Sequence, residues 1–252
     1  MKTKIFCDSA DYETIKKLNN NFLVSGFTTN PSLMRSAGAK NYKNYSLKLL
    51  GICKKKPISL EVFGDTYDQM LKQANIINSW GKNVYVKIPV VNSRGSFSGK
   101  VINVLSKKGV KLNITAVYTV PQVRKILKKI NKNSKTIISI FAGRMGDVGK
   151  DPIPIIKESV RLTKKYKNIQ ILWASTREAY NFLQAKELGC EIITMPPKIM
   201  KVQCFMIIKK EKTGQKLSGS KIEHYFFLDQ KIIPIIVFEE IINQIELFWF
   251  AI

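Results

Sequence analysis

Cysteine and histidine are scarce in this chain of 252 residues, which holds four cysteines and one histidine. Cys7, Cys53, Cys190 and Cys204 show no C-x-x-C spacing and have no histidine partners nearby. Zinc sites and disulfide frameworks both depend on such spacings, so neither is indicated and we expect no metal. The cysteine usage predicts a reducing environment, that of the cytoplasm.

The chain also lacks an uninterrupted hydrophobic run long enough to cross a membrane. Its first residues, MKTKIFCDSADYE, place only three apolar residues together before an aspartate, too few for the apolar region of a signal peptide. The most hydrophobic stretch, 232–252, is interrupted by Pro234, Glu239, Glu240 and Glu246. A membrane-spanning helix would contain these residues only at high cost, so we expect no membrane partner.

Acidic residues are few, 18 against 42 basic residues, which gives a net charge of +24. Such a charge is typical of proteins that bind nucleic acid, anionic membranes or phosphorylated ligands. Here the lysines are dispersed in pairs among apolar residues, for example Lys128-Lys129 and Lys164-Lys165, as on solvated helix faces. We therefore expect no nucleic-acid partner, and keep a basic nucleic-acid-binding protein as the alternative from another class.

With 45% hydrophobic and 24% charged residues, the composition is that of a globular protein. Short runs of β-branched and aromatic residues alternate with segments of helical periodicity, for example 66–80, 120–132, 152–166 and 176–188. Asp151-Pro152 marks a helix start, and Gly109 and Gly189 mark helix ends. Strands are expected at 4–7, 23–28, 58–61, 84–88, 111–115, 136–141, 169–174 and 191–195.

Eight strands separated by helices predict the α/β class, as a single-domain (β/α)8 TIM barrel with parallel strands. A doubly wound open sheet is the alternative fold. The pattern changes near residue 205, so we predict a catalytic barrel over 1–205 and a divergent C-terminal helical segment over 206–252. The broad apolar surface of that segment would pack on the barrel or on a neighbouring subunit.

Functional residues of such barrels lie at the carboxyl ends of the strands. Lys87, in VYVKIP, is expected inside the barrel, where removal from water favours the free amine that attacks a carbonyl to form a Schiff base. The alternative is a lysine that extends to water. The other polar or aromatic residues at or just beyond the strand ends are Asp8, Thr28, Asn30, Glu61, Asn113, Thr115, Ser139, Phe141, Arg144, Ser175 and Arg177.

Carbon–carbon cleavage beside an iminium requires a base and an acid, and Asp8 and Glu61 could fill these roles. Asp8 could instead cap the first helix. Asn30, in TTNPS, could bond a substrate hydroxyl or organise the turn before Pro31.

Ser175-Thr176-Arg177-Glu178 matches a capping box, and a capped helix start beside Arg177 suits a phosphate. Arg144 could complete a phosphate clamp, or form an ion pair with Asp147 or Asp151.

Taken together, these motifs resemble the transaldolase family, particularly its short single-barrel members. The matching segments are FCDSAD, GFTTNPSL, SLEV, VYVKIP, LNITAVYT, SIFAGRMGD, WASTRE and GCEIITMPP, in order over roughly residues 4 to 197. GFTTNPSL and VKIP together are quite specific. The C-terminal fifth departs from the family pattern, in which a final helix packs on a neighbouring subunit of a homo-oligomer.

The resemblance implies a transferase, without metal or cofactor, that moves a dihydroxyacetone unit from fructose 6-phosphate or sedoheptulose 7-phosphate to an aldose phosphate, in the pentose phosphate pathway. Lys87 would form the Schiff base, Asp8 would handle the hydroxyl proton, and Glu61 with Thr115 would hold a relay water. The remaining residues would bind substrate: Asn30, Asn113 and Ser139 along the ketose chain, with Arg144, Ser175 and Arg177 at the phosphate.

Fructose-6-phosphate aldolase, a lyase that releases free dihydroxyacetone, is the close alternative within this family. In that subgroup a tyrosine stands at the position of Phe141 and a glutamine at that of Glu61. The present residues therefore resemble the transferases more than the lyases.

Overall fold

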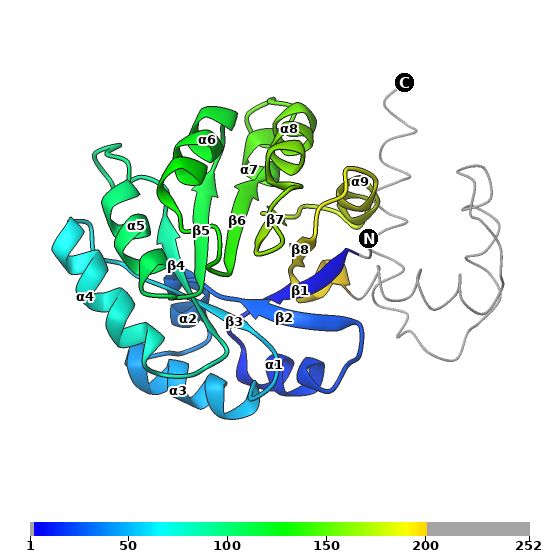
Figure 1. Cartoon of the computed structure of the whole chain (residues 1–252). Helices are drawn as coiled ribbons and strands as arrows, with labels where there is room; N and C mark the ends of the chain where they lie inside the picture. The colour runs from blue at the N-terminus through cyan, green and yellow to red at the C-terminus, as the bar shows by residue number, and fades with distance from the viewer. Residues whose placement is uncertain (1–2, 201–252) are drawn as a thin grey trace, which may run out of the picture. The chain divides into compact units, whose positions relative to one another are not determined.

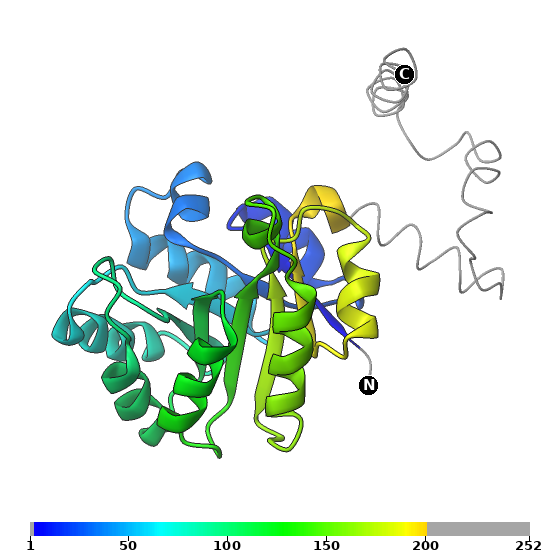
Figure 2. The ribbon, with the colours of Figure 1, turned by 90° about the horizontal axis from the view of Figure 1, so that it is seen from above.

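The computed structural model describes residues 3–200, which form a ring of strands inside a layer of helices (Figures 1 and 2). The strands are β1 (Lys4–Asp8), β2 (Val24–Thr28), β3 (Ile58–Glu61), β4 (Val84–Pro89), β5 (Leu112–Val117), β6 (Thr136–Phe141), β7 (Ile169–Ala174) and β8 (Ile192–Met195). The helices are α1 (Tyr12–Asn19), α2 (Pro31–Ser36), α3 (Tyr42–Ile52), α4 (Tyr67–Asn78), α5 (Gly99–Lys107), α6 (Val120–Lys129), α7 (Ala142–Gly146), α8 (Ile153–Thr163) and α9 (Asn181–Glu187).

The sheet is closed and parallel throughout. Each strand pairs with its neighbours in chain order, and β1 also pairs with β8, with Lys4 opposite Ile192 and Cys7 opposite Met195. This closure confirms the predicted (β/α)8 barrel and excludes the doubly wound open sheet. All eight strands lie within two residues of their predicted bounds, because strands buried on both faces appear as short apolar runs.

Helices α5 and α9 end at the glycines that were predicted to end them. Gly109 and Gly189 come just after the caps of α5 and α9 and adopt φ values of 75° and 79°, the left-handed region that glycine enters without a steric penalty. Helix α8 begins at Ile153, one residue after the predicted start, and the Asp151 carboxylate accepts a 2.9 Å hydrogen bond from the Ile153 N–H.

The barrel interior holds an apolar cluster, and polar side chains follow it along three of the strands. Phe6, Ile137, Leu172, Ala174 and Ile192 form a buried cluster drawn from β1, β6, β7 and β8. Two residues further along three of these strands, the side chains are Asp8, Ser139 and Thr194. Because alternate residues of a strand face the same side, the polar side chains gather above the cluster, toward the carboxyl ends of the strands.

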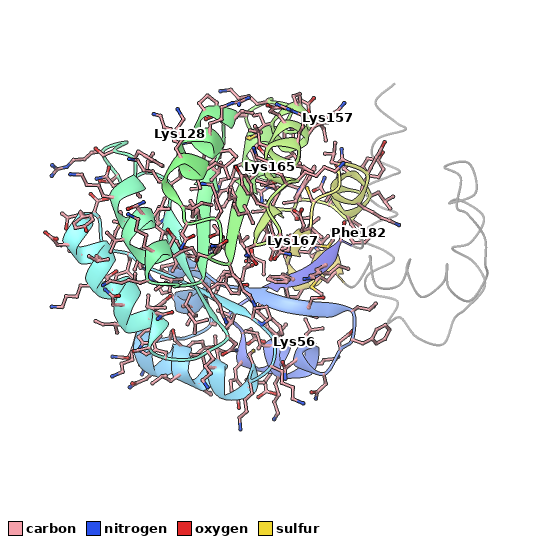
Figure 3. All side chains as sticks on the ribbon, in the orientation of Figure 1. Lys56, Lys128, Lys157, Lys165, Lys167 and Phe182 are labelled. Atoms are coloured by element: carbon pink, nitrogen blue, oxygen red, sulfur yellow. The ribbon has the colours of Figure 1, made fainter. Side chains whose placement is uncertain are left out.

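Lysines are spread around the outside of the barrel. In Figure 3, Lys56 lies on the side of the barrel opposite Lys128 and Lys157, which belong to α6 and α8. This distribution agrees with the solvated faces predicted from the dispersed lysine pairs.

Segment 206–252 lies outside the described residues, so the division of the chain at residue 205 and the packing of the last helix stay predictions. No helix within residues 3–200 is long and apolar enough to cross a membrane.

Gly26 on β2 offers a test of the apolar cluster, since a Cβ there would lie 2.6 Å from the Phe6 ring. We expect Gly26→Ala to lower the free energy of unfolding by about 1–3 kcal/mol, because the ring has to move within a packed interior. Urea denaturation measures this change.

Gly51→Ala is the matched control, because Gly51 is exposed on α3 and a Cβ there meets nothing within 4 Å. Alanine favours helix over glycine by about 0.8–1 kcal/mol, so this variant should be at least as stable as the wild type. Equal unfolding free energies for the two variants would contradict the packing described for Phe6.

Candidate active site

Lys87 lies inside the barrel on β4, with 7% of its surface exposed. Its Nζ is 3.0 Å from Oε2 of Glu61 on the adjacent strand and donates a 2.7 Å hydrogen bond to the Thr29 carbonyl. The alternative of a lysine that extends to water is therefore wrong. The contact with Glu61 places a carboxylate within reach of the proton that the amine must lose before it can act as a nucleophile.

Asp8 ends β1 on the same face of the sheet and does not cap a helix. Its Oδ1 accepts a 2.7 Å hydrogen bond from Thr28 Oγ1, which is itself 2.5 Å from Thr194 Oγ1. Helix α1 is instead capped by Asp11, whose carboxylate accepts from the Thr14 N–H. The capping alternative for Asp8 is therefore wrong, and its carboxylate is available for other chemistry.

Burial raises the pKa of Asp8 above its ordinary value, against the opposing effects of the Thr28 hydrogen bond and of nearby Lys87. A carboxyl group with a raised pKa holds its proton more tightly and is a stronger base when ionised. Asp8 thus has the character expected of a group that exchanges a proton with a ligand.

Asn113 and Ser139 form a buried hydrogen-bonded chain across β3, β5 and β6. Asn113 Nδ2 donates to Ser59 Oγ at 3.0 Å, and Ser139 Oγ donates to Asn113 Oδ1 at 2.7 Å. Lys87 lies opposite Asn113 in the ladder between β4 and β5. The structure therefore brings both predicted residues to the site and fixes the orientation of the amide.

Thr115 is buried, and its hydroxyl has no hydrogen-bond partner among the described residues. The next residue, Ala116, has a φ of 57°, and the register of β5 against β6 shifts between Ile114 and Val117. Bulges of this kind redirect side chains near functional sites. An unpaired buried hydroxyl at this position is suited to a water or a ligand group.

Asn30 organises the turn after β2. Its Oδ1 accepts a 2.8 Å hydrogen bond from the Leu33 N–H, so it caps α2, and Pro31 is the first residue of that helix. The turn-forming alternative is what the structure has. The predicted contact with a substrate hydroxyl stays a prediction.

The two arginines expected to bind phosphate lie beyond β6 and β7. The Arg144 guanidinium lies 5.1 Å from the centre of the Phe141 ring. Arg177 Nε donates to Asp147 Oδ1 at 2.9 Å and Nη2 to Oδ2 at 2.5 Å, which holds the pKa of Asp147 below its ordinary value. The alternative for Arg144 was an ion pair with Asp147 or Asp151, and of these Asp147 pairs with Arg177 instead.

The predicted capping box at Ser175 is wrong. Ser175 has a φ of 63° and α9 begins at Asn181, whose Oδ1 accepts from the N–H groups of Arg177 and Glu178. The reason is tertiary: Thr176 Oγ1 donates to the Thr194 carbonyl at 2.7 Å and ties this segment to β8. The backbone N–H groups of Arg177 and Glu178 are thus occupied, so the donors that this segment can offer an anion are the side chains of Ser175 and Arg177.

Gly143 brings the loops after β6 and β7 together. A Cβ at Gly143 would lie 1.7 Å from the Ser175 carbonyl oxygen, so only glycine permits this approach. The contact keeps the segments that contain Arg144 and Arg177 beside each other.

Sequence reasoning missed Ser59, Thr194 and Tyr42. Ser59 precedes Glu61 by two residues and shares its face of β3, so the strand period could have indicated it. Tyr42 is 19 residues from Glu61 and left no signal. Within residues 3–200, no group of three acidic, cysteine or histidine side chains could hold a metal ion.

The fold and the site together define a class: a (β/α)8-barrel protein with a buried lysine and two carboxylates near the carboxyl ends of its strands. A family model described as transaldolase/fructose-6-phosphate aldolase matches residues 5–232, and the chain belongs to this family. The match continues beyond residue 197, where the motifs of the sequence analysis end.

Relatives named probable transaldolase support the same assignment. One from Herpetosiphon aurantiacus is 34% identical over 199 residues, which cover 78% of this chain and 85% of the relative. Another, from Streptococcus equi subsp. zooepidemicus, is 35% identical over 196 residues, 77% and 86% of the two chains. These relatives extend the similarity over most of both chains.

Solved structures of other barrels resemble the fold alone. A putative dihydrodipicolinate synthase family protein from Coccidioides immitis superposes with a TM-score of 0.60 at 11% identity, over 83% of this chain and 72% of that chain. Orotidine 5'-monophosphate decarboxylase from Metallosphaera sedula gives 0.53 at 14% identity, over 84% and 99%.

The raised pKa of Asp8 predicts a stability that depends on pH. The folded state holds the Asp8 proton more tightly than the unfolded chain, so wild-type stability falls as pH rises from the ordinary value of 3.8 through the raised value. Asp8→Asn removes this titration. The difference in thermal midpoint, Asp8→Asn minus wild type, should therefore be more positive at pH 7 than at pH 4. Scanning calorimetry measures both midpoints.

Asp11→Asn is the control of opposite sign, because hydrogen bonds from Thr14 lower the pKa of Asp11. Its midpoint relative to wild type should be lower at pH 7 and should recover as pH falls below 3.8. A midpoint difference for Asp8→Asn that does not change with pH would contradict the burial of that carboxylate.

Proposed function

We propose that the protein is a transaldolase, which transfers a dihydroxyacetone unit from fructose 6-phosphate or sedoheptulose 7-phosphate to an aldose phosphate through a Schiff base on Lys87. The observation that carries the proposal is the buried Nζ of Lys87, 3.0 Å from the Glu61 carboxylate, in a chain of the transaldolase/fructose-6-phosphate aldolase family. An amine held among barrel walls beside a base is suited to attack a ketone.

In the first step, Glu61 takes a proton from Lys87 and the free amine attacks the C2 carbonyl of the ketose. Loss of water from the resulting carbinolamine gives an iminium. A water between Glu61 and the Thr115 hydroxyl would relay these protons, and the unpaired, buried Thr115 Oγ1 supports that role. The iminium then serves as the electron sink for cleavage.

In the second step, Asp8 takes the proton of the C4 hydroxyl. The C3–C4 bond breaks, its electron pair passes into the iminium to form an enamine, and the first aldose phosphate leaves. The raised pKa of Asp8 supports this role, since a more basic carboxylate accepts a hydroxyl proton more readily. Attack of the enamine on a second aldose phosphate, with return of the proton by Asp8, and hydrolysis of the iminium complete the transfer.

The remaining site residues would hold the substrate. Thr28 orients Asp8, while Asn30, Asn113 and Ser139 would bond the hydroxyls of the ketose chain. The phosphate would lie between Arg144, Ser175 and Arg177, where it takes the place of Asp147 beside Arg177. The phosphate can compete with Asp147 because the Arg177–Asp147 pair is about half exposed, and water screens the attraction between exposed charges.

The wider setting belongs to the same proposal. A transferase of this kind would act in the pentose phosphate pathway, and the widely spaced cysteines favour the cytoplasm. The apolar helix expected near the end of segment 206–252 would pack on the barrel or on a neighbouring subunit, and the second arrangement would give a homo-oligomer.

The competing function within this family is that of fructose-6-phosphate aldolase. Phe141 lacks the hydroxyl that a tyrosine would bring to water-dependent steps, and this favours transfer over release of free dihydroxyacetone. The Phe141 ring packs edge-on against the Tyr118 ring, with 5.7 Å between ring centroids, and beneath the Arg144 guanidinium. It therefore lines the site without offering a proton.

The test is consumption of fructose 6-phosphate with and without erythrose 4-phosphate as acceptor. We expect sedoheptulose 7-phosphate to form only with the acceptor, and Lys87→Met to reduce kcat at least about 1000-fold because no Schiff base forms. Lys111→Met is the control, since Lys111 stands just before β5, at the other end of the barrel, and its replacement should leave kcat unchanged.

Two results would contradict a transaldolase and favour another function. Equal consumption without an acceptor would identify a lyase. Steeply salt-dependent DNA binding that Lys87→Met leaves intact, in a protein without sugar-phosphate activity, would favour a nucleic-acid-binding protein.

A further inference from the structure

The backbone hydrogen bonds between β2 and β3 stop one bond before Glu61. Their register pairs Phe27 with Ile58 and Thr28 with Ser59, and the Thr29 N–H then donates to the Ser59 carbonyl at 3.1 Å. In a regular parallel ladder the next bond would join the Glu61 N–H to the Thr29 carbonyl. That carbonyl instead accepts from Lys87 Nζ at 2.7 Å.

The Tyr42 hydroxyl replaces the missing hydrogen bond from the Glu61 N–H to the Thr29 carbonyl. Tyr42 is the first residue of α3, and its hydroxyl accepts from the Glu61 N–H and donates to the Glu61 carbonyl, both at 2.9 Å. Burial raises the pKa of Tyr42, so the phenol stays neutral and can both donate and accept. Both backbone polar groups of Glu61 thus have a partner without the Thr29 carbonyl.

The Tyr42 ring is fixed by its neighbours. It meets the Phe63 ring edge-on at 5.2 Å between centroids and lies 6.1 Å from that of Trp80. The opposite edge of β3 pairs with β4. There Glu61 lies opposite Lys87, and the Val62 N–H donates a 3.1 Å hydrogen bond to the Lys87 carbonyl. The Glu61 backbone is therefore held from both edges of the strand.

We propose that Tyr42 is a positioning residue, whose hydroxyl holds Glu61 against Lys87 and leaves the Thr29 carbonyl free to bind the Lys87 amine. This inference rests on the proposed function, because it assigns Tyr42 to the placement of the base that activates Lys87. Without the hydroxyl, the Glu61 N–H has no partner unless the strand shifts to form that hydrogen bond with the Thr29 carbonyl. Such a shift moves the carboxylate relative to the amine and withdraws the carbonyl from Lys87.

Tyr42→Phe keeps the ring and removes only the hydroxyl. In the transfer assay with fructose 6-phosphate and erythrose 4-phosphate, we expect kcat to fall about tenfold, because a misplaced base slows proton transfer. KM for fructose 6-phosphate should change less than about twofold, because Tyr42 does not touch the proposed substrate contacts.

Tyr45→Phe is the matched control. Tyr45 lies one turn further along α3, and its hydroxyl donates to the carbonyls of Ala10 and Ala37 at 3.0 and 3.2 Å. Both variants therefore lose one hydroxyl from the same helix, and thermal midpoints of both report the cost in stability. The control should keep kcat within about twofold of wild type, since its hydroxyl bonds no residue of the site.

A double-mutant cycle with Glu61→Gln decides whether Tyr42 acts through Glu61. In the Glu61→Gln background, Tyr42→Phe should cost only about two- to threefold in kcat, because the carboxylate that it places is already absent and only the shift of the Thr29 carbonyl remains. A tenfold loss in that background, an unchanged kcat for Tyr42→Phe alone, a loss confined to KM, or an equal loss in Tyr45→Phe would each overturn the positioning role. A wild-type enzyme that forms no sedoheptulose 7-phosphate would overturn the proposed function and this inference with it.

Discussion

A lysine ammonium inside a barrel depends on groups that replace water, because removing an unpaired charge from solvent costs several kcal/mol. The Glu61 carboxylate and the Thr29 carbonyl supply that replacement for Lys87, at 3.0 and 2.7 Å. Three adjacent strands contribute to it: β4 bears the lysine, β3 presents the carboxylate, and β2 ends its ladder early enough to release a carbonyl. A fourth strand, β5, brings Asn113 beside this contact, because Asn113 lies opposite Lys87 in the ladder.

An apolar cluster inside the barrel limits where chemistry can occur. It consists of Phe6, Ile137, Leu172, Ala174 and Ile192, and the Phe6 ring occupies the space left by the missing side chain of Gly26. Polar side chains therefore face the carboxyl ends of the strands, where the loops meet. Asp8 is one of these side chains, and its burial there raises its pKa.

The fold and the centre of the site could be predicted from sequence because both depend on local pattern. Buried parallel strands are short β-branched runs, and Asp8, Glu61 and Lys87 stand out at the ends of such runs. The failures depend on tertiary contacts: Ser175 turns to meet Gly143 instead of capping a helix, and Asp147 pairs with Arg177 across 30 residues. The bond from Tyr42 to Glu61 spans 19 residues and has no local signature.

In the proposed reaction Lys87, and no other lysine of this lysine-rich chain, forms a covalent bond with a ketose. Borohydride reduction in the presence of fructose 6-phosphate, followed by peptide mass mapping, tests it most directly. We expect one reduced adduct, of dihydroxyacetone or of the hexose phosphate, on the peptide that contains Lys87, and none in Lys87→Met. An adduct on another lysine, or the absence of any adduct in an enzyme that performs the transfer, would contradict it.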